Sequence, residues 1–249
     1  MARILEICID SLASARAAIR GGADRIELCS ALALGGLTPF PTLLQQIREE
    51  SDIPVRCLIR PRSGDFLYSM DEINLMARQI RELRATGANG FVIGCLLDNG
   101  NLDMDALDPL IDAADGAGLT LHRCIDVSRD PMQTYLQAGH LGFDTVLTSG
   151  AAASCTEGIG TLQKLLNMRD KTGGPEVLIG AGVNPGNIRH LMTQLPCATA
   201  FHASCKQMKE SAMQFRRADV PMGLPNLDEW HIQQTDENQV RLLKSALNA

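Results

Sequence analysis

The sequence has no long apolar run and no excess of positive charge. No stretch approaches the ~20 consecutive apolar residues that span a bilayer, and Glu6 interrupts the N-terminal segment before a signal peptide could form. The 23 Lys and Arg residues are outnumbered by 29 Asp and Glu residues, which gives a net charge of −6. Nucleic-acid binding needs the opposite balance, because phosphate groups attract cations. We therefore expect a cytoplasmic protein without a membrane or nucleic-acid partner.

Aromatic residues are scarce, at 4%, and none of the eight cysteines forms a Cys-x-x-Cys pair. The scarcity of aromatics predicts a core built from aliphatic side chains. The missing pair argues against a zinc ribbon and a thioredoxin motif, and in a cytoplasmic protein the cysteines should be reduced thiols. With 45% apolar and 21% charged residues, the chain is not disordered. The length fits a single domain over residues 1–249.

Short apolar runs alternate with longer segments of helical period along the chain, which predicts parallel strands joined by helices. Strands are expected near Leu5–Ile9, Arg25–Cys29, Val55–Ile59, Phe91–Gly94, Leu119–Cys124, Thr145–Thr148, Val177–Ala181 and Ala200–Ala203. Helices are expected over Ser11–Arg20, Thr42–Glu50, Asp71–Thr86 and Thr156–Lys171, among others, with an irregular segment from Lys206 to Ile232 and a last helix over Glu237–Leu247.

Eight such units in about 250 residues match the size of a TIM (β/α)8 barrel. A Gly followed by a short polar turn and a strand recurs at Gly22, Gly87 and Gly142, which supports repeated units. A doubly wound open sheet is the alternative. It usually has fewer strands, and its nucleotide-binding form has a Gly-rich first turn. The first turn here is Asp10-Ser11, so we favour the barrel.

The first two predicted strands each carry a Glu and a Cys two residues apart. Side chains alternate along a strand, so Glu6 shares a face with Cys8, and Glu27 shares one with Cys29. The opposite faces are apolar and suited to helix packing, so the Glu/Cys faces should point into the barrel, near its C-terminal mouth. Two neighbouring thiols there could bind a soft metal such as Cu(I) or zinc. Alternatively, they pack as small hydrophobic side chains.

Buried carboxylates need partners, and the other strands supply candidates. Arg60 and Arg62 follow the third strand, His122 and Asp126 lie at the fifth, and His202 lies in the eighth. One interpretation is a structural ion-pair network inside the barrel. The other is a pocket for a small anion, because the guanidinium fork suits phosphate or carboxylate. In the second interpretation the candidate catalytic acids and bases are Glu27, His122 and Asp126.

Two loops also favour an anion. Thr148-Ser149-Gly150 follows the sixth strand, and Gly180-Ala181-Gly182 follows the seventh, where Asn184-Pro185 is predicted to open a helix. Helix N-termini bind anions through free backbone N–H groups, although a Gly-x-Gly is equally explained by a tight turn. The full set of candidate ligand-binding residues is Glu6, Glu27, Arg60, Arg62, His122, Thr148, Ser149, Gly182 and His202.

The same segments resemble the copper homeostasis protein family CutC, in order from residue 4 to about 223. The segments that carry the resemblance are Glu6-Ile7-Cys8-Ile9-Asp10-Ser11, Gly21 through Cys29, Gly35-Gly36-Leu37-Thr38-Pro39, Ile59-Arg60-Pro61-Arg62, Gly64-Asp65-Phe66, His122-Arg123, Asp126 and Leu147-Thr148-Ser149-Gly150. One departure is Ala200, where the family often has Glu.

The resemblance implies a cytoplasmic TIM barrel that handles copper, with Cys8 and Cys29 as the Cu(I) ligands. It also leaves a homo-oligomer open, because family members often form dimers or larger assemblies. Two hypotheses follow. The first is a copper homeostasis protein in which Glu6 or Glu27 tunes thiol protonation. The second is an enzyme of unknown reaction on a small anionic substrate. A pure scaffold is disfavoured, because so many charges inside a barrel would be costly without a use.

Overall fold

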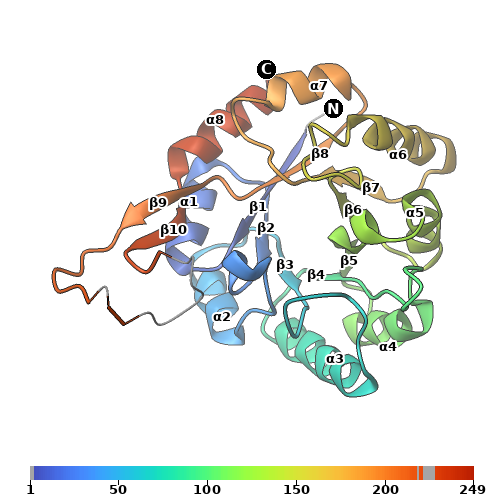
Figure 1. Ribbon diagram of the computed structural model, residues 1–249, viewed down its shortest axis with the longest axis horizontal. Helices are drawn as coiled ribbons and strands as arrows, with labels where there is room; N and C mark the ends of the chain where they lie inside the picture. Colours follow the sequence, from blue (N-terminus) through green and yellow to red (C-terminus); the bar gives the residue numbers. More distant parts are fainter. Residues whose placement is uncertain (1–2, 218, 221–227) are drawn as a thin grey trace.

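The computed structural model describes residues 3–217, 219–220 and 228–249, and its centre is a closed parallel barrel (Figure 1). The barrel strands follow chain order, and the eighth pairs with the first, so the sheet has no open edge. The strands are β1 (Ile4–Ile9), β2 (Arg25–Leu28), β3 (Val55–Leu58), β4 (Gly90–Ile93), β5 (Gly118–Leu121), β6 (Thr145–Thr148), β7 (Glu176–Ile179) and β8 (Ala200–Ala203). The predicted TIM barrel is confirmed, and the open-sheet alternative is excluded.

Helices surround the barrel on the outside (Figure 1). They are α1 (Leu12–Gly21), α2 (Pro41–Glu50), α3 (Met70–Ala85), α4 (Met104–Ala114), α5 (Pro131–His140), α6 (Ile159–Thr172), α7 (Ile188–Gln194) and α8 (Glu237–Leu247). Local sequence fixes their ends. Before α3, for example, Ser69 accepts a hydrogen bond from the Glu72 N–H while the Glu72 carboxylate accepts one from the Ser69 N–H. Within the described residues, no helix combines the length and apolar character of a membrane span.

The apolar core lies between the strands and the helices. Outward-facing strand residues such as Ile7, Ile26 and Phe91 are completely buried in one cluster with residues of the helices. The inner face of the barrel has two smaller apolar clusters, one of Cys29, Leu58 and Val92 and one of Leu147, Leu178 and Ala200. The remaining inward positions are largely polar, so the barrel interior contains most of the chemistry of the fold.

The fifth strand is shorter than predicted. It ends at Leu121 instead of Cys124, and the chain turns into a 3-10 helix over Arg123–Val127. The reason is local: the His122 imidazole Nδ1 accepts a hydrogen bond from the Cys124 N–H at 3.2 Å. A side chain that caps the backbone in this way competes with the strand ladder.

The segment from Lys206 to Ile232 is not wholly irregular, so that prediction is wrong in part. Strands β9 (Lys206–Glu210) and β10 (His231–Thr235) pair antiparallel, beside α1 and outside the barrel (Figure 1). All five residues of β9 are exposed, so the strand lacks the apolar alternation by which strands are recognised. Residue 218 and residues 221–227 of that prediction lie outside the described residues.

Candidate functional site

A cleft of about 220 Å³ opens at the carboxyl ends of the barrel strands. Four strands or their immediate extensions contribute predicted site residues to its lining. The lining residues are Cys8, Glu27, Cys29, Leu32, Gly35, Leu58, His122, Arg123, Leu147, His202, Ser204 and Lys206. The structure thus brings together five of the residues that the sequence analysis singled out.

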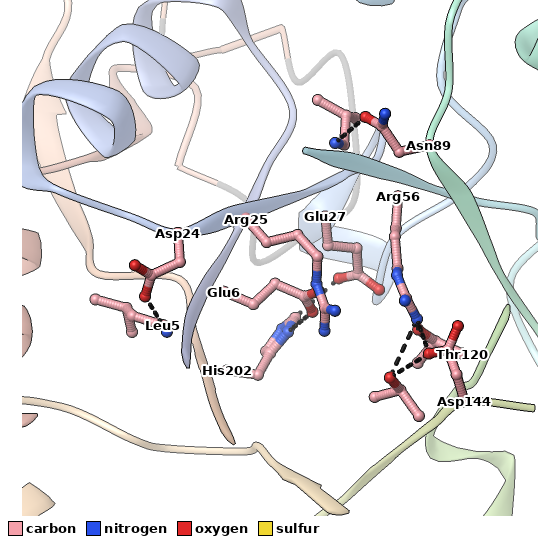
Figure 2. A network of polar contacts seen from close by, with 12 residues as sticks. Leu5, Glu6, Asp24, Arg25, Glu27, Arg56, Asn89, Thr120, Asp144 and His202 are labelled. Carbon is pink, nitrogen blue, oxygen red and sulfur yellow. Dashed lines mark hydrogen bonds and ion pairs between the residues drawn. The ribbon is translucent and has the colours of Figure 1, made fainter. Parts of the chain in front are cut away.

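Glu6 lies just below this cleft and is completely buried. It is paired in register with Arg25 on β2 and with His202 on β8, so both neighbours reach its carboxylate directly. One oxygen contacts Arg25 Nε, and the other lies 2.8 Å from His202 Nδ1 (Figure 2). Burial alone would raise the pKa of Glu6, but the His202 hydrogen bond and the Arg25 charge together lower it to about 2. Glu6 is therefore ionised, and His202 Nδ1 is the hydrogen-bond donor.

His202 presents its other ring nitrogen to the cleft lining. Its Nε2 lies 3.6 Å from Glu27 Oε2. The Cys8 sulfur, a Glu27 oxygen and a His202 nitrogen all lie within 4.8 Å of one another, a grouping that could hold a metal ion. Burial alone would lower the pKa of His202, but Cys8, Glu27 and Glu6 raise it well above its usual value.

Cys29 lines the same cleft from the next strand but lies outside that three-residue grouping. Its side chain is 1% exposed and packs with Leu58 and Val92. Burial and the nearby Glu27 raise the pKa of Cys29 well above its usual value. Cys29 is therefore a protonated thiol as the structure stands, and a bound metal ion would have to displace its proton.

A second polar network lies in the barrel interior. Arg56 Nη1 donates hydrogen bonds to Thr120 Oγ1 at 2.6 Å and to Asp144 Oδ1 at 2.7 Å (Figure 2). These partners account for the Arg56 charge without a ligand. The interpretation as a structural ion-pair network therefore fits the Arg56 contacts. The Glu6 contacts differ, because they lie next to a cleft that could hold a ligand.

The structure does not bring Arg60 or Arg62 into the cleft lining. The Arg60 guanidinium is buried and donates to the backbone carbonyls of Leu34, Gly36 and Gly64, which ties together the loops after β2 and β3. Arg62 pairs with Glu72 at 2.6 Å. Both guanidinium groups are engaged within the protein, so neither presents a free fork to an anion in the cleft.

Asp126, Thr148 and Ser149 form their own cluster beside the cleft. One Asp126 oxygen accepts hydrogen bonds from Thr148 Oγ1 at 2.5 Å and from the Ser149 N–H at 3.1 Å. The carboxylate also pairs with Arg123. The cluster therefore holds the loop after β6 to the turn after β5, and its polar groups are satisfied by one another.

The helix predicted to open at Asn184-Pro185 begins only at Ile188, so that prediction is wrong. Asn184 Oδ1 accepts a hydrogen bond from the Gly186 N–H at 2.9 Å, which makes a turn in place of a helix start. The Gly182 carbonyl accepts hydrogen bonds from the side chains of Asn184 and Asn187. Gly182 is thus part of a tight turn and does not line the cleft.

Two polar residues of the site, Arg25 and Lys206, were missed as candidate ligands or partners. Arg25 has a clear signal, because it lies two residues before Glu27 on the same strand face. Lys206 lines the cleft but lies in a segment without strand periodicity, so no sequence signal places it there.

Comparisons with known proteins agree on one family. A model of the CutC family matches residues 3–207. The family protein CutC of Chromobacterium violaceum is 42% identical over 249 residues, which cover 100% of this chain and 99% of that protein. A Homo sapiens protein named copper homeostasis protein cutC homolog is 39% identical over 243 residues, which cover 97% of this chain and 88% of that protein.

The structures agree as well. The crystal structure of a candidate copper homeostasis protein CutC from Streptococcus agalactiae superposes with a TM-score of 0.76 and 26% identity. The match covers 81% of this chain and 98% of that one. The predicted resemblance is confirmed by the family model, by the relatives and by this fold: the chain belongs to the CutC family.

Proposed function

We propose that this protein binds Cu(I) at the mouth of its barrel, with Cys8 as the central ligand. His202 is the second ligand, and Cys29 is the further thiol in the same cleft. The observation that carries the proposal is the mutual approach of Cys8, Glu27 and His202 within 4.8 Å. Copper in particular is suggested by the name of the human relative, a copper homeostasis protein cutC homolog.

The donor set fits a soft metal ion. Thiolate sulfur favours Cu(I) and zinc, and imidazole suits both copper and zinc, whereas a carboxylate is a harder ligand. Glu27 is therefore better suited to take the proton released on binding than to bind Cu(I) itself. We place this function in the cytoplasm, where the eight free cysteines of the chain stay reduced.

Glu6 supports the site from behind. An acceptor on one ring nitrogen of a histidine fixes the ring and leaves the other nitrogen for a metal. Glu6 accepts from His202 Nδ1, so Nε2 is the atom available to Cu(I). Thiol and imidazole groups bind a metal ion without their protons, so Cu(I) affinity should fall as the pH is lowered.

We expect Cys8→Ser to abolish stoichiometric Cu(I) uptake, measured anaerobically against a chromogenic Cu(I) chelator. His202→Gln removes a ligand and should weaken binding at least as much as the roughly 10- to 100-fold loss found when a group that only supports a metal ligand is removed. Cys29→Ser tests whether the second thiol takes part: a loss as large as that of Cys8→Ser would assign the ion to the two cysteines.

Cys197→Ser is the matched control, because Cys197 is an exposed thiol that does not line the cleft. It should leave uptake unchanged. If Cys8→Ser retains the Cu(I) affinity of the unmodified protein, the proposed site is wrong. Parallel titration with Zn(II) separates a copper site from a zinc site, since tighter binding of zinc at the same residues would contradict the choice of metal.

A further inference from the structure

His122 occupies the opposite wall of the cleft and is not used by the proposed metal site. Its side chain is buried, with 5% of the residue exposed, and its ring packs against Phe66 with centroids 4.6 Å apart. The ring is seated against Gly94, where an added Cβ would lie 2.5 Å from His122 Cε1. A glycine at that position is therefore what allows the imidazole to occupy this place.

The hydrogen bond at Nδ1 determines which nitrogen carries the proton. Because Nδ1 accepts from the Cys124 N–H, its lone pair is used, and the neutral ring carries its hydrogen on Nε2. Burial and the adjacent Arg60 lower the pKa of His122 to about 3. The ring is thus neutral under physiological conditions, and Nε2–H is a fixed, uncharged hydrogen-bond donor.

That donor has no acceptor within the part of the chain that the structure describes. Among the described residues, the buried side-chain nitrogen and oxygen atoms without a partner are Arg60 Nε, Tyr68 Oη and His122 Nε2. Of the three residues, only His122 lines the cleft. Leaving a buried donor unpaired is costly, so proteins rarely keep one without a purpose. The Nδ1 edge faces Cys124 and Gly94, so Nε2 is the polar atom that this ring can offer to a ligand at the cleft wall.

The charge around the cleft indicates the rest of the ligand. The Arg and Lys side chains of its lining are Arg123 and Lys206, and both are exposed, although Arg123 also pairs with Asp126 and Lys206 also donates to Gln233. A carboxylate at the rim would meet these two charges. A neutral donor in the wall suits an uncharged carbonyl oxygen. A volume of about 220 Å³ is below the ~300–1,000 Å³ of sites for drug-sized ligands, so the ligand must be small.

We propose that this cleft binds a small oxo-carboxylate, with its carbonyl oxygen accepting from His122 Nε2–H and its carboxylate near Arg123 and Lys206. This makes His122 a ligand-binding residue of a small-molecule site that does not require copper. It also gives the enzyme hypothesis a concrete form, because a donor fixed on a carbonyl oxygen polarises that carbonyl.

The test uses metal-free full-length protein and two probes, pyruvate and 2-oxobutyrate, followed by NMR of the histidine ring resonances and by calorimetry. Propionate, which has a carboxylate but no carbonyl, is the control ligand. We expect at least one oxo acid to bind more tightly than propionate and to shift the His122 resonances. Binding of that acid should weaken as salt is added, because the rim cations are exposed.

The variant His122→Asn removes the Nε2–H donor but can keep the hydrogen bond from the Cys124 N–H. The Asn oxygen can still accept from the Cys124 N–H, but the side chain no longer reaches the position of Nε2. We expect oxo-acid affinity to fall roughly tenfold, the effect of one lost hydrogen bond, while propionate binding and thermal stability stay unchanged. His140→Asn, on the exposed side of α5, is the matched control and should change nothing.

The proposal is overturned if neither oxo acid binds more tightly than propionate. It is equally overturned if His122→Asn binds the oxo acids as well as the unmodified protein does, since a bound water molecule would then be the only partner of Nε2. The Cu(I) titration measures a different ligand on the opposite wall, so either proposal can fail without the other.

Discussion

Replacing Glu6 with Gln should lower the free energy of unfolding by about 3–5 kcal/mol, the usual result of removing one partner of a buried ion pair. Glu6 is completely buried and lies between Arg25 and His202. Gln has nearly the same shape, so packing is kept while the charge is lost. Arg25 would then remain inside the barrel without its counter-charge. Urea denaturation of metal-free protein, followed by circular dichroism, measures the change.

Glu50→Gln is the control for this experiment. Glu50 also forms an ion pair, with Arg16, but on the exposed surface between α1 and α2. Exposed pairs contribute little, because water and salt already screen them. Similar losses in the two variants would show that the barrel interior does not strengthen the Glu6 pair, contrary to our expectation.

Acid should remove the difference between the Glu6→Gln variant and the unmodified protein. The pKa of Glu6 is lowered from 4.5 to about 2 in the folded state. A carboxyl whose folded pKa is depressed stabilises the protein above its unfolded pKa and loses this contribution as the pH falls towards the folded value. The gap in unfolding free energy should therefore be full above about pH 5 and narrow progressively between pH 4.5 and pH 2. A gap that stays constant over this range would assign the loss to packing.

Gly158→Ala should be the most disruptive glycine substitution near the site, costing on the order of 3 kcal/mol or more. A Cβ at Gly158 would lie 1.9 Å from the Ser149 carbonyl oxygen and 3.0 Å from the Gly150 Cα. Both contacts are to backbone, so no side chain can rotate away. The backbone of Gly158 is otherwise ordinary, with φ −83°, so the cost comes from space alone. The loop after β6 would have to separate from the start of α6.

Gly160→Ala supplies the comparison two residues further along. It lies inside α6, and an added Cβ would meet nothing within 4 Å. Alanine is the better helix former by about 0.5–1 kcal/mol, so this variant should gain stability while Gly158→Ala loses it. Thermal unfolding of the two variants measures whether each change raises or lowers stability. A mild effect of Gly158→Ala would show that the two backbone segments separate easily.

The alternation of side chains along the strands supported most of the predictions that the sequence allowed. It placed Glu6, Cys8 and Glu27 on inward faces correctly, because period-two patterning reports directly on which side of a strand is buried. Chain order then predicted the barrel. The predicted strands also placed His202 at the same mouth of the barrel. Nothing in the sequence indicates that it pairs with Glu6 across the seam between β1 and β8, where the barrel closes. That pairing depends on register, which local sequence does not encode.

The roles of the arginines could not be predicted from the sequence in the same way. Arg60 and Arg62 follow a strand end, where anion ligands often occur, yet they bind the loop backbone and Glu72. A guanidinium donates to carbonyl, carboxylate or phosphate oxygens alike, so its partner depends on which loop folds over it. His122 shows the converse case: the residue type indicated a site, while its cap on Cys124 appears only in three dimensions.

The seam between β1 and β8 has a consequence for how the protein is made. Glu6 and His202 are 196 positions apart in the chain, and Cys8 meets His202 only across the same seam. A nascent polypeptide whose eighth strand is still inside the ribosome already displays Cys8, Glu27 and Cys29 but has no imidazole beside them. The proposed Cu(I) site can therefore form only after β8 has been synthesised and has paired with β1, and partial unfolding that detaches β8 would take the site apart.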